Sequence, residues 1–213
     1  AAELAACGAQ LVIAGRREDV LREAAAELGC DWVAGDIREE EDAARIVGTA
    51  LERHGRLDVL VNNAGGQYYV PAEGITAKGW RAVQRLNVEG TARMTDEAAR
   101  RAFLPQRSGT VVNVTVSPHH GFPGMAHTGA ARSAVEALTQ ELAQRWAADG
   151  VTLVAAALGR FATASLLKYP EQVLAQAGST IPLGRLGTMD EFAWLVALLA
   201  SPLGRTLSGT TVT

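Results

Sequence analysis

The chain has 213 residues, of which 48% are hydrophobic and 20% charged, so it can bury the core of one globular domain. Its 20 basic and 23 acidic side chains leave a net charge of −3, which argues against the basic field typical of nucleic-acid-binding proteins. The longest apolar runs, such as 151–158, are too short to cross a bilayer. We therefore expect no nucleic-acid partner and no membrane partner. Since no charged-then-apolar leader opens the chain, we expect a cytoplasmic protein.

Cysteine and histidine are sparse. Cys7 and Cys30 are the only cysteines, and their apolar neighbours favour two buried thiols over a disulfide. His119, His120 and His127 lie close together in sequence, but no grouping of Cys, His and acidic residues has the spacing of metal ligands. We expect no metal site.

Apolar strand-like runs alternate with amphipathic helical stretches, a pattern typical of a parallel sheet covered on both faces. The expected strands are 10–14, 32–34, 57–61, 110–116, 151–157 and 210–213, and the expected helices are 20–28, 43–51, 76–103, 131–146 and 189–200. Residues 1–8 resemble the second half of a helix. This predicts a single α/β domain over 1–213 with a doubly wound sheet, truncated at both ends. It would lack its first strand and the glycine-rich turn that normally follows that strand.

Three motifs occur in a characteristic order. Asn62-Asn63-Ala64-Gly65 follows an expected strand, Asn87 lies in the next helix, and Gly159 follows the strand that starts at 151. In this order and spacing, which covers essentially the whole chain, the sequence resembles the short-chain dehydrogenase/reductase family. The resemblance implies a Rossmann-type fold that binds a nicotinamide cofactor.

A narrower resemblance rests on five short runs. They are Gly65-Gly66-Gln67, Pro71-Ala72-Glu73, Lys78-Gly79-Trp80, Gly121-Phe122-Pro123 and His127-Thr128-Gly129-Ala130-Ala131-Arg132. Together they resemble the trans-2-enoyl-CoA reductase branch and its neighbours, the 2,4-dienoyl-CoA reductases. The resemblance implies reduction of a carbon–carbon double bond of an acyl-CoA thioester with NADPH, and therefore a place in fatty acid metabolism.

The residues themselves favour NADP over NAD. In a dinucleotide-binding fold, an acidic residue at the end of the second strand holds the ribose 2′-hydroxyl of NAD. Here that strand ends in Gly15-Arg16-Arg17, without a carboxylate before Glu18. Because a guanidinium pairs well with phosphate, Arg16 and Arg17 favour the 2′-phosphate of NADP. The alternative is a solvated arginine pair at the start of a helix.

Further cofactor contacts are implied by family position alone. Asp36 and Ile37 would flank the adenine, Asn63, Ala64 and Gly65 would line the two riboses, and Gly159, Phe161 and Thr163 would reach the carboxamide and phosphates. The family usually has proline before that last glycine, and this chain has Leu158 instead.

The catalytic positions depart from the family pattern. Most members have a tyrosine four residues before a lysine, and here these positions hold Thr128 and Arg132. Thr115 and Ser117 are both candidates for the family's serine. Arg132 can still grip the nicotinamide ribose, but it stays protonated and is unsuited to relaying a proton. Water held by Asn87 could then supply the proton.

Other side chains could act as the acid. Tyr68 and Tyr69 follow the glycine-rich turn, and each could face the substrate or pack on the loop. The three clustered histidines favour a solvated or structural role. Residues 164–179 would cover the substrate.

The missing tyrosine bears on the choice of reaction. Ketone reduction places full alkoxide charge on oxygen and depends on a phenol-like acid, whereas hydrogen bonds and a fixed positive charge can stabilise an enolate. We therefore expect an NADPH-dependent reductase of enoyl-CoA-type thioesters. The alternatives are a carbonyl reductase or dehydrogenase of another small substrate, and a catalytically idle nucleotide-binding family member. A homo-oligomer, specifically a tetramer, is expected through helices 91–103 and 131–146, where Ala98, Ala99, Ala130 and Ala137 would permit close approach.

Overall fold

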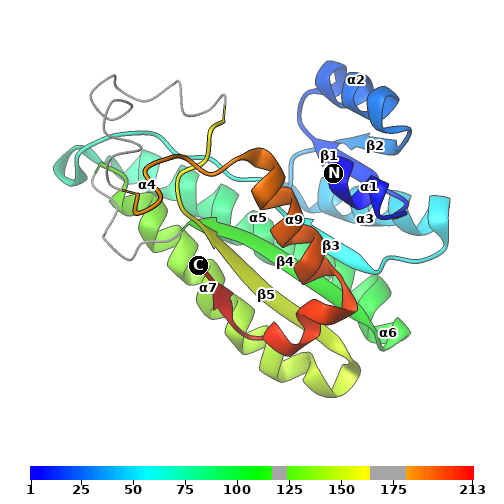
Figure 1. Ribbon diagram of the computed structural model, residues 1–213. Helices are drawn as coiled ribbons and strands as arrows, with labels where there is room; N and C mark the ends of the chain where they lie inside the picture. Colours follow the sequence, from blue (N-terminus) through cyan, green and yellow to red (C-terminus); the bar gives the residue numbers. More distant parts are fainter. Residues whose placement is uncertain (117–123, 164–180) are drawn as a thin grey trace.

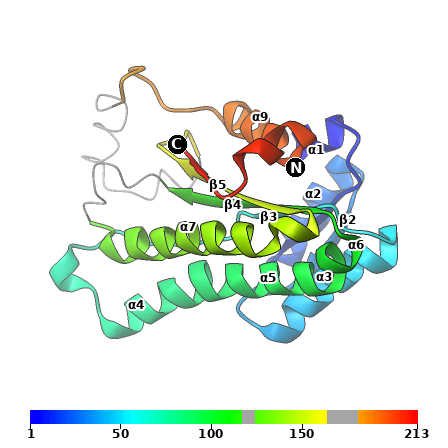
Figure 2. The same cartoon turned by 90° about the horizontal axis from the view of Figure 1, so that it is seen from below.

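The computed structural model describes residues 1–116, 124–163 and 181–213. These residues form one layer of parallel strands between two layers of helices (Figures 1 and 2). Helices α3 (Glu40–His54), α5 (Gly90–Ala98) and α7 (Ala126–Trp146) cover one face, and α9 (Met189–Ala200) lies across the other with α1 (Ala2–Ala6) beside it. The expected α/β fold with a parallel sheet is confirmed.

The strands form two hydrogen-bonded sheets. The first pairs β1 (Val12–Gly15) with β2 (Asp31–Ala34), and the second has the order β3 (Val59–Asn62), β4 (Gly109–Val116), β5 (Val151–Leu158), β6 (Thr211–Val212). Every pairing is parallel. The hydrogen bonding breaks between β1 and β3, which is where a doubly wound order places the first strand. That such a strand precedes β1 in the protein stays a prediction.

The helical elements follow the expected ranges closely. Besides those named above they are α2 (Glu18–Leu28), η1 (Ala72–Gly74), α4 (Ala77–Gln84), η2 (Arg85–Glu89), η3 (Ala99–Phe103), α6 (Leu104–Gln106), η4 (Ala147–Asp149) and η6 (Pro202–Leu207). The stretch from α4 to α6 runs as one helix interrupted by two π-helical turns, η2 and η3. Helix α9 begins with a capping box, in which the Thr188 side chain accepts from the Glu191 backbone N–H and the Glu191 carboxylate accepts from that of Thr188.

The main core lies between the sheet and helices α3, α5 and α7. Phe103, Val111 and Leu153 are fully buried there, and Ala98 belongs to the same cluster. Ala98 and Ala99 are therefore used inside the domain, and the expectation that they form an oligomer interface is wrong. Ala130 and Ala137 are exposed on α7.

The cysteine expectation is half correct. Both thiols are free, but Cys7 is exposed and Cys30 is only half-buried. The expectation that they are buried is wrong, because Cys7 ends α1, none of whose residues is buried in this structure, and Cys30 occupies the turn between α2 and β2.

Candidate functional site

The site residues gather at one edge of the sheet because all the strands are parallel and their carboxyl ends lie on the same side. Four groups of predicted residues follow directly after strands: Arg16 and Arg17 after β1, Asp36 and Ile37 after β2, Asn63 to Gly65 after β3, and Gly159 after β5. Asn63, Ala64 and Gly65 are exposed, so their backbone is open to a ligand.

Two arginines follow β1 at this edge of the sheet. Arg16 and Arg17 are exposed, and within the described residues neither donates a hydrogen bond to a protein group. The carboxylate of Asp36 is held by Arg38, whose Nε lies 2.9 Å from Oδ1. Hydrogen bonding from Arg38 lowers the pKa of Asp36 from 3.8 to about 2, and the nearby charge of Arg16 adds to the effect. Asp36 is therefore ionised and already paired.

Ile37 packs inward rather than standing free. A Cβ placed on Gly90 of α5 would lie 2.8 Å from the Ile37 side chain, so that glycine makes room for it. Arg93 donates to the backbone oxygen of Arg38 at 2.9 Å and fixes the same loop.

Gly65 lies where two polar side chains meet. A Cβ at Gly65 would lie 2.2 Å from Nη2 of Arg132 and 2.8 Å from Oδ1 of Asn87. The Arg132 side chain comes from α7 and is only 7% exposed, and its Nη1 donates to the backbone oxygen of Val114 at 2.8 Å. In the described part of the chain it forms no salt bridge, and its Nε has no partner. Burial lowers the pKa of this guanidinium from its ordinary value.

Asn87 holds the loop after β3 from the π-helical turn η2, a type of helix irregularity often found at functional sites. Its fully buried amide donates to the backbone oxygens of Gly66 and Val83, both at 2.8 Å, and accepts from the Gly66 N–H at 3.2 Å. Both amide N–H groups are thus used by the backbone. Only the remaining lone pair of the Asn87 side-chain oxygen is available for the water that this residue was expected to hold.

Two of the candidate hydroxyls differ in availability. Thr115 lies near the end of β4, almost fully buried, and donates to Oε1 of Glu136 at 2.9 Å. Since a hydroxyl carries one proton, Thr115 has none left for a substrate. Thr128 is fully buried on α7, and its Oγ1 has no hydrogen-bond partner within the described ranges. Ser117 lies outside the described residues, as do His119 and His120.

His127 is the second residue of α7, which begins before the helix expected at 131–146, and its side chain is fully buried. A solvated role is therefore excluded for His127, whereas the structural role that was also expected agrees with its burial. Burial lowers the pKa of the imidazole. The ring of Tyr68 packs edge-on against it, with the ring centroids 4.4 Å apart.

A buried polar network was missed by sequence reasoning. Asn62 donates to Thr95 Oγ1 at 3.0 Å and to Asn113 Oδ1 at 2.8 Å, and Asn113 donates to Thr139 Oγ1 at 2.9 Å. The network ties α5, β3, β4 and α7 together directly behind the site. The signal was Asn113 itself, a polar residue in the middle of an otherwise apolar strand and opposite Asn62 in register.

The backbone that follows β5 is less crowded than the backbone at Gly65. A Cβ placed on Gly159 would meet no atom of the described residues within 4 Å, whereas the Phe161 ring packs over Gly187 and lies 6.1 Å from the ring of Phe192. Phe161 also pairs with Gly187 in a short parallel bridge. Thr163 is half-buried.

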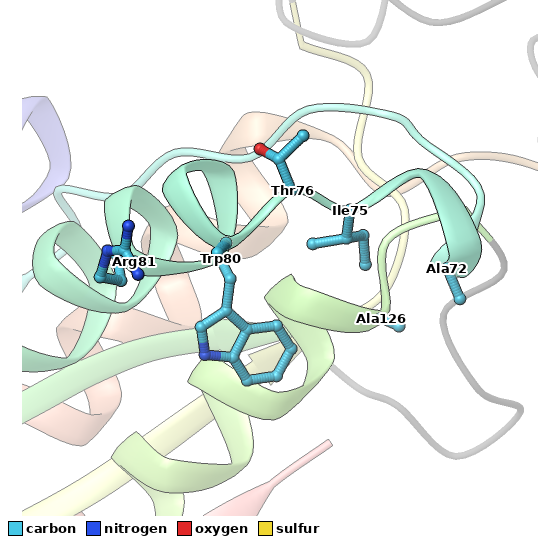
Figure 3. Close-up of a pocket in the computed structure, with 7 residues that line it drawn as sticks. Ala72, Ile75, Thr76, Trp80, Arg81 and Ala126 are labelled. Atoms are coloured by element: carbon cyan, nitrogen blue, oxygen red, sulfur yellow. The ribbon is translucent and has the colours of Figure 1, made fainter.

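A groove of about 520 Å³ lies beside the start of α7 (Figure 3). Its lining is mostly apolar and comprises Ala72, Ile75, Thr76, Ala77, Trp80, Arg81 and Ala126. Trp80 extends from α4 toward α7, and Ala126 directly precedes the buried pair His127 and Thr128. The groove therefore ends at the residue that precedes His127 and Thr128 in the chain, and neither of these two side chains lines it.

No described helix combines the length and apolarity needed to cross a membrane. Within the same residues there is no group of three or more His, Cys, Asp or Glu side chains placed to hold a metal ion.

The fold and this edge define a nicotinamide-dependent oxidoreductase of the short-chain dehydrogenase/reductase class, whose members use NAD(P)(H). Residues 1–213 match the family described as "Enoyl-(Acyl carrier protein) reductase", and the chain belongs to that family. It is 32% identical over 218 residues to a "Probable 2,4-dienoyl-CoA reductase" of Bacillus subtilis, covering 97% of this chain and 85% of the relative. It is 30% identical to a "Peroxisomal 2,4-dienoyl-CoA reductase" of Arabidopsis thaliana, covering 96% of this chain and 74% of the relative.

Among solved structures, the chain is similar to "citronellol catabolism dehydrogenase (AtuB)" of Pseudomonas aeruginosa PAO1. The TM-score is 0.88 at 35% identity, covering 100% of this chain and 85% of that one. The short-chain dehydrogenase/reductase resemblance is thereby confirmed, together with the likeness to the dienoyl-CoA reductase branch.

Proposed function

We propose that this protein reduces a carbon–carbon double bond of an enoyl-CoA-type thioester with NADPH. The observation that carries the proposal is that two buried polar groups lie one helical turn apart on α7. Arg132 has a guanidinium without an acidic partner in the described chain, and Thr128 has a hydroxyl without a hydrogen-bond partner there. Buried polar groups are normally satisfied, so both point to a ligand that supplies their partners. The relatives named 2,4-dienoyl-CoA reductases support an acyl-CoA substrate.

The residues present fit a nicotinamide dinucleotide. Arg132 is packed against Gly65, where a side chain would collide with it, and the exposed backbone of Asn63 to Gly65 lies alongside. At the other end, Arg16 and Arg17 offer exposed guanidinium groups for a 2′-phosphate, because Asp36 is already held by Arg38. We therefore propose NADP as the cofactor. When bound, it supplies the hydride for Cβ of the substrate.

The side chains would act on the charge that develops at the thioester oxygen. Thr128 donates its O–H to that oxygen, and the fixed positive charge of Arg132 stabilises the enolate while its N–H groups hold the nicotinamide ribose. Thr115 donates its proton to Glu136 on α7 and is therefore not assigned a contact with the substrate. A threonine hydroxyl is too weak an acid to protonate carbon, so the proton at Cα comes from water.

The groove beside Ala126 supplies the apolar surface that an acyl chain requires. The cytoplasm stays the predicted compartment.

The experiment is NADPH oxidation by the purified protein with crotonyl-CoA and a longer 2,4-dienoyl-CoA. Thr128→Val keeps the shape and removes the donor, so the rate should fall by roughly 10²–10³. Ser133→Ala is the matched control, because it removes an exposed hydroxyl from the same helix and should leave the rate unchanged. Reduction of ketones without reduction of either thioester would replace the proposal by the carbonyl-reductase alternative. Cofactor binding without any turnover would replace it by the idle-protein alternative.

A further inference from the structure

His127 has a combination of features that the proposed function does not use. Its side chain is fully buried at the second position of α7, and neither Nδ1 nor Nε2 has a hydrogen-bond partner in the ranges that the structure describes. A histidine kept only for packing would bond at least one nitrogen to the protein, since buried polar atoms are almost always paired.

The position of the ring is nevertheless fixed. Tyr68 packs edge-on against it at a centroid distance of 4.4 Å. Tyr68 is itself fixed over Gly79 of α4, where a Cβ would lie 1.9 Å from the tyrosine oxygen. From the same helix, Gln84 Nε2 donates to the backbone oxygen of His127 at 3.4 Å. The imidazole is held in place by its surroundings, while both of its ring nitrogens are buried without a hydrogen-bond partner in the described residues.

The His127 ring lies next to other residues of the candidate site. His127 directly precedes Thr128, and Tyr68 belongs to the loop that leaves β3 through Gly65 and Gly66. The two consecutive residues at the start of α7 are thus both fully buried, and both carry polar atoms without a partner in the described chain. They follow Ala126, which lines the groove, and precede Arg132, which packs against Gly65.

We propose that His127 is a further catalytic residue, which donates a ring N–H to the thioester oxygen of the substrate alongside Thr128. Tyr68 is its positioning residue. The proposal rests on the proposed function. It involves no covalent step, because the imidazole only donates a hydrogen bond that strengthens as negative charge develops on the oxygen.

The charge state suits this role. Burial lowers the pKa of His127, which keeps the imidazole neutral near pH 7. A neutral imidazole has one N–H donor, which is the group that an oxyanion needs.

The test compares three variants by turnover of crotonyl-CoA. His127→Phe keeps a ring but removes the donor, and it should lower kcat by roughly 10²–10³. His127→Gln keeps an N–H donor and should lose much less. His54→Gln is the matched control, since His54 ends α3 just before β3 begins, at the opposite edge of the sheet, and its Nε2 lies 3.3 Å from Asp31. In all three variants NADPH affinity should stay within about twofold, because the cofactor contacts are untouched.

Tyr68 is tested separately as a positioning residue. Tyr68→Ala should lower kcat roughly three- to tenfold, in keeping with the worth of one aromatic pair, and Tyr68→Phe should restore it. If Tyr68 had only a structural role, Tyr68→Ala would lower the stability of the protein, but kcat would not fall with Ala and recover with Phe.

A second readout separates this inference from the proposed function. The ring ¹⁵N signals of His127 should move when butyryl-CoA, an unreactive saturated thioester, is added with NADP⁺. If the wild type turns over and His127→Phe stays within threefold of it, His127 is not catalytic although the proposed function stands. If the wild type reduces no thioester, the proposed function fails on its own. The catalytic role of His127 then falls with it, and a movement of the ring signals would show only that the thioester binds beside the ring.

Discussion

Replacing Gly65 with alanine tests the contact at the centre of the site. The new Cβ would lie 2.2 Å from Nη2 of Arg132 and 2.8 Å from Oδ1 of Asn87, and both distances are far inside van der Waals contact. Arg132 is buried and its Nη1 is tied to the Val114 oxygen, while the Asn87 amide is bonded on both sides. One of them must move and lose its hydrogen bonds.

The cost follows from that displacement. Overpacking a buried site typically costs about 1–3 kcal/mol, and one lost hydrogen bond about 1 kcal/mol more. For a domain of this size we expect Tm to fall by roughly 4–16 °C. NADPH affinity should fall at least about tenfold, because the guanidinium that holds the ribose is displaced.

Gly48→Ala is the matched control. Its Cβ would also meet an arginine, with Nη2 of Arg101 at 3.3 Å, and Arg101 likewise donates to a backbone oxygen, that of Ala44. The Arg101 side chain is 36% exposed and can shift into solvent. This mid-helix substitution should be neutral or stabilising by up to about 1 kcal/mol. Scanning calorimetry and a fluorescence titration with NADPH measure both variants. Equal stability and cofactor affinity for Gly65→Ala and wild type would refute the placement of Arg132.

Three further predictions concern the cofactor, pH and assembly. Arg16→Ala should weaken NADPH binding by roughly ten- to a hundredfold and leave NADH nearly unchanged, and equal affinities of the unmodified protein for the two cofactors would defeat the NADP assignment. Because the pKa of Asp36 falls from 3.8 to about 2 on folding, Asp36→Asn should cost about 2 kcal/mol at pH 7. Urea titrations should show this difference shrinking as the pH falls below about 4 and vanishing only below about pH 2, and a pH-independent difference would contradict it. Light scattering should show that the wild-type protein is a tetramer. The substitution Ala134→Arg lies on the exposed face of α7 between Ala130 and Ala137 and should convert the tetramer to smaller species. A monomeric wild type at micromolar concentration would refute the assembly.

Periodicity predicted the elements well where local signals are strong. The helix expected at 189–200 coincides with α9, and the strand expected at 151–157 ends one residue later, at Leu158. The long helix after residue 76 was also predicted, but its π-helical turns were not. The pattern of apolar residues does not encode where a helix widens by one residue to admit tertiary contacts such as those of Asn87.

The sequence predicted which residues lie at the site but not which side chains they contact. Sequence order placed Gly65, Asn87 and Arg132 near one another, yet their mutual contact depends on how α7 and η2 pack behind the loop. Thr115, at a candidate serine position, and Thr128, at the tyrosine position, were both expected to donate from a hydroxyl. Only packing shows that the Thr115 proton is committed to Glu136 while the Thr128 hydroxyl has no partner in the described residues. The burial of His127 likewise depends on Tyr68, a residue from a distant loop.

The proposed reaction passes a hydride from NADPH to an enoyl-CoA thioester at the edge of the sheet where Arg132 and Thr128 lie. The most direct measurement is mass spectrometry of the acyl-CoA product after incubation of the protein with crotonyl-CoA and NADPH deuterated at the transferring position. We expect butyryl-CoA that carries one deuterium at Cβ, and much less of this product from the Thr128→Val variant. Recovery of unlabelled crotonyl-CoA together with unoxidised cofactor would contradict it.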